Sequence, residues 1–351
     1  MTPALVAVTY NRFLYLIYFN YNYTMIVLCI FLLTQMNLLA TAVETRTFVA
    51  ANDHLMIFAH NDVEYFTFIL SDDKIGSHTK YQCVLNYSYF NHLKEVADVA
   101  IGVEQNQSHL VFAYSTKIQQ GKNPSWSLMI VYLQKNNATD QCVQIEKIFN
   151  VTLHDTGDRH GVVIAMDPYG TRVYAISGVV VYLFDIVSTA LSVYPISAGP
   201  GIPWQAFYNK DLLVTVDHRL LLLGLSNEKP YLRLLEIAYA NVVLLLANKQ
   251  LSDSRIKYAT INNHPLFDTS LSMAIHHQAE FVIIGIPSLN LVFIVSIRNH
   301  KDITIMKEHS TPMTSVGFGQ SVAFISNNTY SVLVGNQTTL PWSLSQVQVS
   351  K

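Results

Sequence analysis

Short apolar segments return in pairs along the chain, and their regular spacing is the feature that most restricts the fold. In each pair an apolar run meets a polar turn and is followed by a second apolar run. The pairs are FVAANDHLMIFA, VAIGVEQNQSHLVFAY, VVIAMDPYGTRVYAIS, LLVTVDHRLLLLGL, LSMAIHHQAEFVIIGIP and SVAFISNNTYSVLVG. Aligned at equivalent positions they recur every 49 to 65 residues, with anchors at Ala50, Ala100, Ala165, Val214, Ala274 and Ala323.

Further apolar runs follow each pair and complete a repeating unit. Third runs begin at Val63, Ser127, Val179, Tyr231, Asn290 and Gln346, and fourth runs follow in most units, for example KYQCVLNY, DQCVQIEKIF, ALSVYPI and DITIMKE. Their β-branched and aromatic content and their Gly, Pro, Asn and Asp turns are typical of strands. A four-stranded unit that repeats at this period predicts an all-β chain folded as a β-propeller, because such a unit buries its faces only by stacking on its neighbours.

The repeat count predicts six blades within one domain spanning residues 43–351. Seven blades result if the long step between Ala100 and Ala165 or the stretch Asn248–Leu271 contains a degenerate unit. A β-sandwich is the competing all-β fold, but it does not predict a repeat of this length. The last unit reaches Lys351 without an evident fourth strand, which indicates either a three-stranded blade or a sequence that is short at its C-terminus.

The N-terminal region has the pattern of an export signal. The apolar run from Met25 ends in Ala40-Thr41-Ala42, the small-x-small pattern of a signal-peptidase site. We therefore expect residues 1–42 to be a signal sequence and the mature chain to be secreted. Translation from Met25 would give a more typical signal, because Arg12 is the only charged residue before it. The alternative is an uncleaved signal anchor, which would give the chain its only membrane contact and leave the propeller extracellular.

Glycosylation sequons agree with export. The N-x-S/T sites after residue 42 are Asn86, Asn106, Asn137, Asn150, Asn327 and Asn336. Only 13% of the residues are charged, against a usual share of about 25%, which suits a surface covered by glycans.

Cysteine usage also agrees with an oxidising compartment. Cys29 lies in the signal, and the remaining two, Cys83 and Cys142, are predicted to form a disulfide. One geometric argument opposes the bond. Both cysteines lie in fourth runs, whose strands fan apart at the rim of a propeller, whereas a disulfide needs Cα atoms within about 7 Å.

Charge and motif content exclude several functions. A net charge of −2 without any run of Lys or Arg argues against a nucleic-acid partner. The chain has no GxSxG elbow, HExxH motif, P-loop or GxGxxG motif, and it lacks the Ser-x-Asp-x-Gly boxes of sialidase-type propellers. His276 and His277 would face opposite sides of a strand and so would not share one ion unless the turn reorients them. We therefore assign no catalytic residue, metal site or cofactor.

The C-terminal units resemble FG-GAP repeats, the blade units of the integrin α N-terminal propeller. The resemblance rests on Phe318–Ala323 with Gly335 twelve residues later, and on Gly285-Ile286-Pro287 followed by the strand Asn290–Ser296. It covers about residues 271–335. The Asp-rich calcium loop of that family is absent, since the two turns read His276-His277-Gln278 and Ser326-Asn327-Asn328. The resemblance implies an extracellular propeller used for recognition.

Ligands of propellers usually bind where the connections from outer to inner strands converge. We expect these connections at 86–94, 150–161, 197–210, 248–271 and 307–320. The candidate ligand-binding residues on them are Asp158, Arg159, His160, Trp204 and His264. The imidazole and carboxylate groups could hold a metal or transfer protons, or the aspartates could simply cap a turn. Trp204 could stack on a sugar or peptide, or pack below the rim.

These features favour a secreted or cell-surface module that binds an extracellular protein or glycan, as in adhesion. The alternative is a secreted propeller enzyme, a hydrolase or lyase with its site at the channel mouth. Carboxylates or histidines clustered at that mouth would indicate an enzyme, whereas an apolar or aromatic patch would indicate a binding protein.

Overall fold

The structure is a computed structural model. It describes residues 5–10, 13–18, 47–51, 55–60, 65–71, 80–86, 96–103, 109–120, 123–135, 143–153, 162–167, 169–197, 207–226, 229–238, 241–252, 256, 271–276, 281–297, 303–310, 319, 322–324, 330–334 and 345–349. The chain divides into two compact units, Met1–Thr45 and Arg46–Lys351. In the first unit β1 (Leu5–Tyr10) pairs with β2 (Phe13–Tyr18), while the predicted signal run lies outside the described residues. Within the described segments, no helix has the length and apolar character needed to span a bilayer.

The second unit consists of strands that pair antiparallel in chain order. The strands are β3 (Thr47–Ala51), β4 (Leu55–His60), β5 (Tyr65–Ser71) and β6 (Lys80–Asn86); β7 (Val96–Val103), β8 (His109–Gln120), β9 (Asn123–Lys135) and β10 (Val143–Leu153); β11 (Val163–Met166), β12 (Arg172–Ser177), β13 (Val180–Asp185) and β14 (Ala190–Ser197); β15 (Phe207–Val214), β16 (Leu220–Ser226), β17 (Lys229–Ala238) and β18 (Val242–Gln250); β19 (Ser272–His276), β20 (Phe281–Ile286), β21 (Leu291–Ser296) and β22 (Thr304–Ser310); and β23 (Val322–Phe324), β24 (Tyr330–Val334) and β25 (Ser345–Val349).

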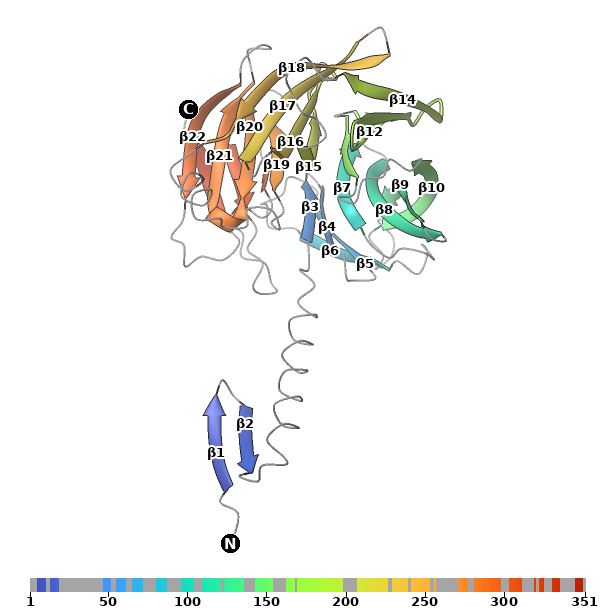
Figure 1. Ribbon diagram of the computed structural model, residues 1–351. Coiled ribbons are helices and arrows are strands. Elements are labelled where there is room, and N and C mark those ends of the chain that lie inside the picture. The colour runs from blue at the N-terminus through green and yellow to red at the C-terminus, as the bar shows by residue number, and fades with distance from the viewer. Residues whose placement is uncertain are drawn as a thin grey trace. The chain divides into compact units, whose positions relative to one another are not determined.

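The first strands of successive groups lie next to one another. The strand β3 contacts β7, β7 contacts β11, and the series continues through β15, β19 and β23, which contacts β3 again. Figure 1 labels β3, β7, β15 and β19 of this series. The molecule is therefore all-β and propeller-like, as predicted. The one helical element with described bounds is the 3₁₀ turn Pro287–Leu289, between β20 and β21. The last sheet has three described strands.

Two groups join into one eight-stranded sheet. Their fourth strands pair in parallel where Ile196 and Ser197 of β14 lie beside Val243 and Leu244 of β18. The expectation that outer strands fan apart is therefore wrong for this pair. The side chains of Ile196 and Val243 belong to the buried apolar cluster between the two groups. Their burial holds the two outer strands close together.

Several connections are shorter than the sequence predicted. Residues 150–153 extend β10, residues 207–210 begin β15, residues 248–250 end β18 and residues 307–310 end β22. At the ends of β10, β18 and β22, polar side chains hide the strand pattern, because these outer strands expose one face to solvent. Asn150 consequently lies on a strand, and its residue is exposed.

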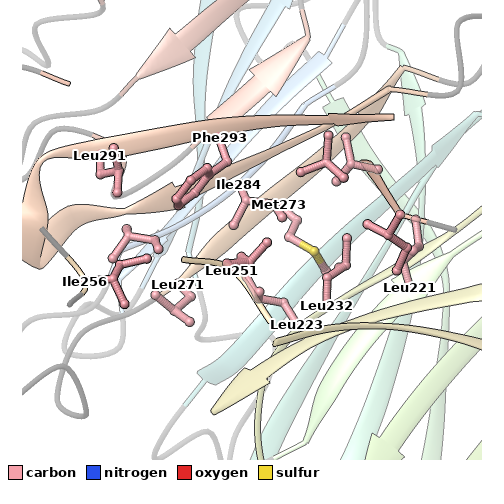
Figure 2. Packing of buried hydrophobic residues seen from close by; sticks show 14 of the residues in the cluster. Leu221, Leu223, Leu232, Leu251, Ile256, Leu271, Met273, Ile284, Leu291 and Phe293 are labelled. Carbon is pink, nitrogen blue, oxygen red and sulfur yellow. The ribbon is translucent and has the colours of Figure 1, made fainter. Parts of the chain in front are cut away.

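The core lies between successive groups. Side chains of β16 and β17 interdigitate with those of β19, β20 and β21, with Leu223, Leu232, Met273, Ile284 and Phe293 among them (Figure 2). Equivalent clusters separate β7–β10 from β11–β14 and β11–β14 from β15–β18. Since each buried Leu, Ile or Phe contributes roughly 1.5–3 kcal/mol, these interfaces stabilise the stacking of the groups.

Two glycines of the FG-GAP-like segment meet backbone to backbone. A Cβ on Gly285 would lie 1.9 Å from the carbonyl oxygen of Gly319, and Gly319 itself has a φ of +91°. The Ser272 hydroxyl donates to the same Gly319 carbonyl at 3.0 Å. The close approach of β20 to the segment before β23 explains physically why both positions are glycine.

Candidate functional site

The predicted ligand-binding residues lie outside the described residues. Asp158, Arg159 and His160 belong to the connection from β10 to β11, Trp204 to that from β14 to β15, and His264 to that from β18 to β19. Each connection leaves a fourth strand and enters the first strand of the next group. The common end of the molecule predicted for these residues therefore stays a prediction.

Two aspartates on first strands, which the sequence did not single out, form bonds between neighbouring groups. Asp98 on β7 accepts the backbone N–H of Ile164 on β11 through Oδ2 at 2.7 Å. Asp211 on β15 accepts the backbone N–H of Met273 on β19 through its own Oδ2. Both bonds join the first strand of one group to the first strand of the next. We refer to Asp98 and Asp211 as the carboxylate pair.

The backbone explains why these N–H groups need a side-chain acceptor. The strands β11 and β19 each pair on one side only, with β12 and β20, so their other edge has no ladder partner among the described strands. An unpaired N–H inside a protein costs free energy comparable to a lost hydrogen bond. The carboxylate pair satisfies Ile164 and Met273 at that edge.

A register irregularity aims each carboxylate. The ladder between β7 and β8 shifts between Val96 and Asp98, and that between β15 and β16 shifts between Asn209 and Asp211. An extra residue reverses the face on which the next side chain lies. Accordingly Asn209 Nδ2 donates to Gly178 of the preceding group at 3.4 Å, whereas Asp211 bonds the following group.

The electrostatic environment distinguishes Asp211. Burial raises the pKa of Asp211 well above its ordinary value, and the nearby charge of Asp98 raises it further. Hydrogen bonds from the backbone N–H groups of Met273 and Leu212 oppose this rise in pKa without cancelling it. Both aspartates are nevertheless partly exposed. Asp211 is thus surrounded by protein but still reached by solvent.

The hydrogen-bond inventory limits what the carboxylate pair can do. Leu212 N–H occupies Asp211 Oδ1 at 2.7 Å and Met273 N–H occupies Oδ2, so both oxygens already accept a bond. Among the described residues, no group of three or more His, Cys, Asp or Glu side chains is placed to hold a metal ion. The described geometry therefore uses Asp98 and Asp211 to bind neighbouring strands.

Hydroxyl side chains form comparable bonds between other neighbours. Ser115 on β8 donates to the Val162 carbonyl at 2.7 Å, and Ser272 on β19 donates to Gly319. Ser272 and Asp98 each lie two residues before the anchor alanine of their repeat, and Asp211 lies three before Val214. This polar position before the anchor was the sequence signal that could have identified the carboxylate pair.

A buried cation lies between the β11–β14 and β15–β18 groups. Arg233 is 2% exposed, its Cζ lies 3.6 Å from the centroid of the Phe207 ring, and its Nε donates to Asn248 Oδ1 at 3.3 Å. Burial lowers the pKa of Arg233 to about 10, so the guanidinium stays charged at neutral pH. A Cβ on Gly224 would lie 2.4 Å from the Phe207 ring, so this glycine provides the space for the stack.

Two similar turns lie between first and second strands. Asp167 accepts Thr171 N–H at 2.7 Å and Arg172 N–H at 2.9 Å, while Thr215 accepts Arg219 N–H at 2.9 Å in the equivalent turn. Exposed Tyr169 and partly buried His218 come together from the two turns, with ring centroids 6.5 Å apart. These turns come directly after first strands, whereas the candidate ligand-binding residues lie on connections that come directly before first strands.

The predicted modification sites are described only in part. Asn86 ends β6 and Asn150 lies on β10, whereas Asn106, Asn137, Asn327 and Asn336 lie outside the described residues. Cys83 lies on β6 and Cys142 outside the described residues, and the described part of the chain contains no disulfide. The Cys83–Cys142 bond stays a prediction.

Comparisons with known proteins give only backbone likenesses. No family model and no curated protein matches the chain. Hydrazine synthase of Kuenenia stuttgartiensis is 12% identical, with a TM-score of 0.49 over 88% of this chain and 99% of that chain. A protein from Lactobacillus plantarum is 13% identical, with a TM-score of 0.47 over 86% and 84% of the two chains. A luciferin-regenerating enzyme is 11% identical, with a TM-score of 0.48 over 84% and 85%. At these values the likeness assigns neither a function nor a site residue.

Proposed function

We propose that this chain is an extracellular, six-bladed propeller that binds a protein or glycan at the end where its outer-to-inner connections enter the first strands. The closed series of contacts through β3, β7, β11, β15, β19 and β23 supports the six blades. The signal-like N-terminus and the sequons support export. The FG-GAP resemblance supports recognition as the activity.

One observation carries the choice of a binding module over an enzyme. The carboxylate pair lies on first strands, and its described hydrogen bonds join neighbouring strands. A catalytic acid or base must instead reach a substrate proton. The candidate ligand-binding residues of the proposed binding module are Asp158, Arg159, His160, Trp204 and His264.

Binding can be tested on arrays of glycans and of extracellular protein domains with the secreted chain. We expect Trp204→Ala to weaken binding by on the order of 1–3 kcal/mol, as for the loss of an aromatic anchor, without lowering the yield of folded protein. Exposed Val216→Ala, on a turn after a first strand, is the matched control and should leave binding unchanged. Wild-type protein that captures nothing on either array would contradict the proposal.

Export is tested separately. Secretion from a eukaryotic cell should yield a chain that begins after Ala42 and loses mass on treatment with an N-glycosidase. Asn150→Gln should remove one glycan, since Asn150 is exposed on β10. A cytosolic product without a mass shift would refute the extracellular location.

A hydrolase is the second candidate, and the raised pKa of Asp211 beside Asp98 is the observation that favours it. A carboxyl group with a raised pKa can act as a general acid, with a second carboxylate as the base or nucleophile. Hydrolysis of a panel of nitrophenyl glycosides, abolished by Asp98→Asn and by Asp211→Asn in a folded chain, would replace the binding proposal with this one. Activity unaffected by either substitution would exclude the carboxylate pair as its source.

A further inference from the structure

The first residues of β17 and the last residues of β18 carry a row of polar side chains on one face. The ladder sets Tyr231 opposite Gln250 and Arg233 opposite Asn248. Residues that lie opposite each other in a ladder, or two apart along a strand, share a face of the sheet. Lys229, the first residue of β17, therefore lies on this face as well. We refer to these five residues as the polar corner.

Solvent reaches most of the polar corner. Asn248 is exposed and Lys229, Tyr231 and Gln250 are partly exposed, whereas Arg233 is buried. The strand β14 pairs with β18 only near the beginning of β18. At the other end of β18, its outer edge has no partner among the described strands. A ligand can therefore approach the end of β18 without displacing a described strand.

The hydrogen bonds within the polar corner turn donors outward. The Arg233 side chain has no acceptor, so the Asn248 oxygen must face its Nε, at 3.3 Å, and the Asn248 amide nitrogen is left to donate elsewhere. The Tyr231 hydroxyl donates to Gln250 Oε1 at 3.2 Å and leaves the Gln250 amide nitrogen in the same position. These two nitrogens lie on residues two apart along β18, about 7 Å. The ammonium group of Lys229 adds further donors.

The charge of the polar corner has one sign. It contains Lys229 and Arg233, and a third cation, Lys249, stands between its two amides in the sequence of β18. The described segments 229–233 and 248–250 contain no aspartate or glutamate. A surface that combines donors with positive charge is complementary to an anion that presents acceptor oxygens.

We propose that the polar corner binds an acidic glycan through the carboxylate or sulfate groups of its sugars. This inference rests on the proposed function and names the class of its ligand. A sugar acid carries hydroxyl oxygens beside its charged group, so one ring can accept bonds from the amides of Asn248 and Gln250 while its charge faces Lys229. An acidic peptide has no such hydroxyls. Gln250 ends β18, and the connection that carries His264 follows it, so the polar corner lies where a connection of the proposed ligand-binding end begins.

The test measures binding of four polymers to the immobilised, secreted chain: heparin, polygalacturonate, dextran and poly-glutamate. We expect heparin or polygalacturonate to bind, which distinguishes sulfate from carboxylate, and dextran and poly-glutamate not to bind. Asn248→Asp should weaken binding at least about tenfold, because it sets a negative charge against the anion. The new carboxylate still accepts the Arg233 bond, so the variant should fold. The matched control is Asn241→Asp, which adds the same charge at an exposed turn residue just before the other end of β18 and should leave binding unchanged.

A second variant tests the positive charge. Lys229→Gln should weaken binding about threefold and make it less dependent on salt. Circular dichroism checks that each variant is folded. Capture of dextran or of a protein domain without either acidic glycan would leave the proposed binding function standing but overturn the acidic glycan as ligand. Equal binding of poly-glutamate, or equal losses for Asn248→Asp and Asn241→Asp, would also overturn it, and a chain that captures nothing would contradict both proposals.

Discussion

At the scale of single residues, the positions that join neighbouring sheets are the ones least able to change. Gly285 and Gly319 allow two backbones to touch, and Asp98 and Asp211 satisfy backbone donors of the next first strand. The two aspartates are only partly exposed. Substitutions there should act on the stacking of sheets more than on any one sheet.

Gly285→Ala is expected to destabilise the protein by about 3 kcal/mol or more. The new Cβ would lie 1.9 Å from a backbone carbonyl oxygen, which has no freedom to rotate away. Gly178→Ala is the control, because that Cβ would meet nothing within 4 Å and only the φ of +55° opposes it, at about 1–2 kcal/mol. Urea unfolding measures both changes, and a Gly285→Ala loss no larger than the control would contradict the close approach.

The carboxyl of Asp211 should make stability depend on pH. Its pKa in the folded chain is raised above the unfolded value of about 3.9. Its stabilising contribution is therefore complete below that value and is lost as the pH rises through the folded pKa. Since Asn does not titrate, the unfolding free energy of Asp211→Asn relative to wild type should increase with pH above about 4.

Asp185 provides a control of opposite sign. The backbone N–H and hydroxyl of Ser188 lower the pKa of Asp185. Its contribution is present above the unfolded pKa and is lost as the pH falls, so the relative stability of Asp185→Asn should decrease as the pH rises from about 2 to 5. Equal slopes for the two variants in urea unfolding between pH 2 and 8 would contradict the pKa directions.

At the scale of strands and turns, the apolar runs predicted most elements because a strand buried on both faces is apolar throughout. The runs VVIAMD, RVYAIS and VVVYLFDI became β11, β12 and β13 with nearly the expected ends. The strand β18 was harder to see, since Asn248, Lys249 and Gln250 at its end resemble a loop. Because this end of β18 faces solvent, its residues are polar, and the apolar run by which a strand is predicted is missing there.

The carboxylate pair was missed for a different reason. An aspartate inside an apolar run reads as a solvated strand residue, and its actual acceptor role depends on a backbone donor more than sixty residues away, in the next sheet. The same holds for the pairing of β14 with β18, which no periodicity encodes. Contacts within a repeat were predictable from the sequence, and contacts between repeats were not.

The turn from β11 to β12 should depend on one carboxylate. Asp167 is fully buried and accepts the Thr171 N–H, the Thr171 hydroxyl and the Arg172 N–H. Asp167→Ala should cost about 2–3 kcal/mol, because it leaves two backbone donors without this acceptor. Asp167→Asn retains one acceptor oxygen and should cost less. Thermal unfolding compares the two, and equal effects would show that one acceptor oxygen is not enough to hold the turn.

At the scale of the whole molecule, the stacking of sheets is a closed series rather than a row with two ends. The strand β23 contacts β19 and β20 on one side and β3 on the other, so the segments nearest the two ends of the second unit are neighbours. Three of these interfaces bury apolar side chains that a single sheet could not cover. Stability is thereby shared around the ring, and we expect unfolding in one cooperative transition.

Removal of residues 322–351 tests this closure. The deletion takes away β23, β24 and β25, uncovers β3 and the β19–β22 sheet, and should abolish the single transition and promote aggregation. Removal of 345–351 alone is the matched control, because β25 pairs only with β24 among the described strands and lies at the outer edge of its sheet. That shorter deletion should leave the transition cooperative and lower its midpoint only modestly. If removal of 322–351 instead leaves a chain that melts cooperatively near the full-length midpoint, the remaining sheets do not need the ring, and the contact between β23 and β3 contributes little to stability.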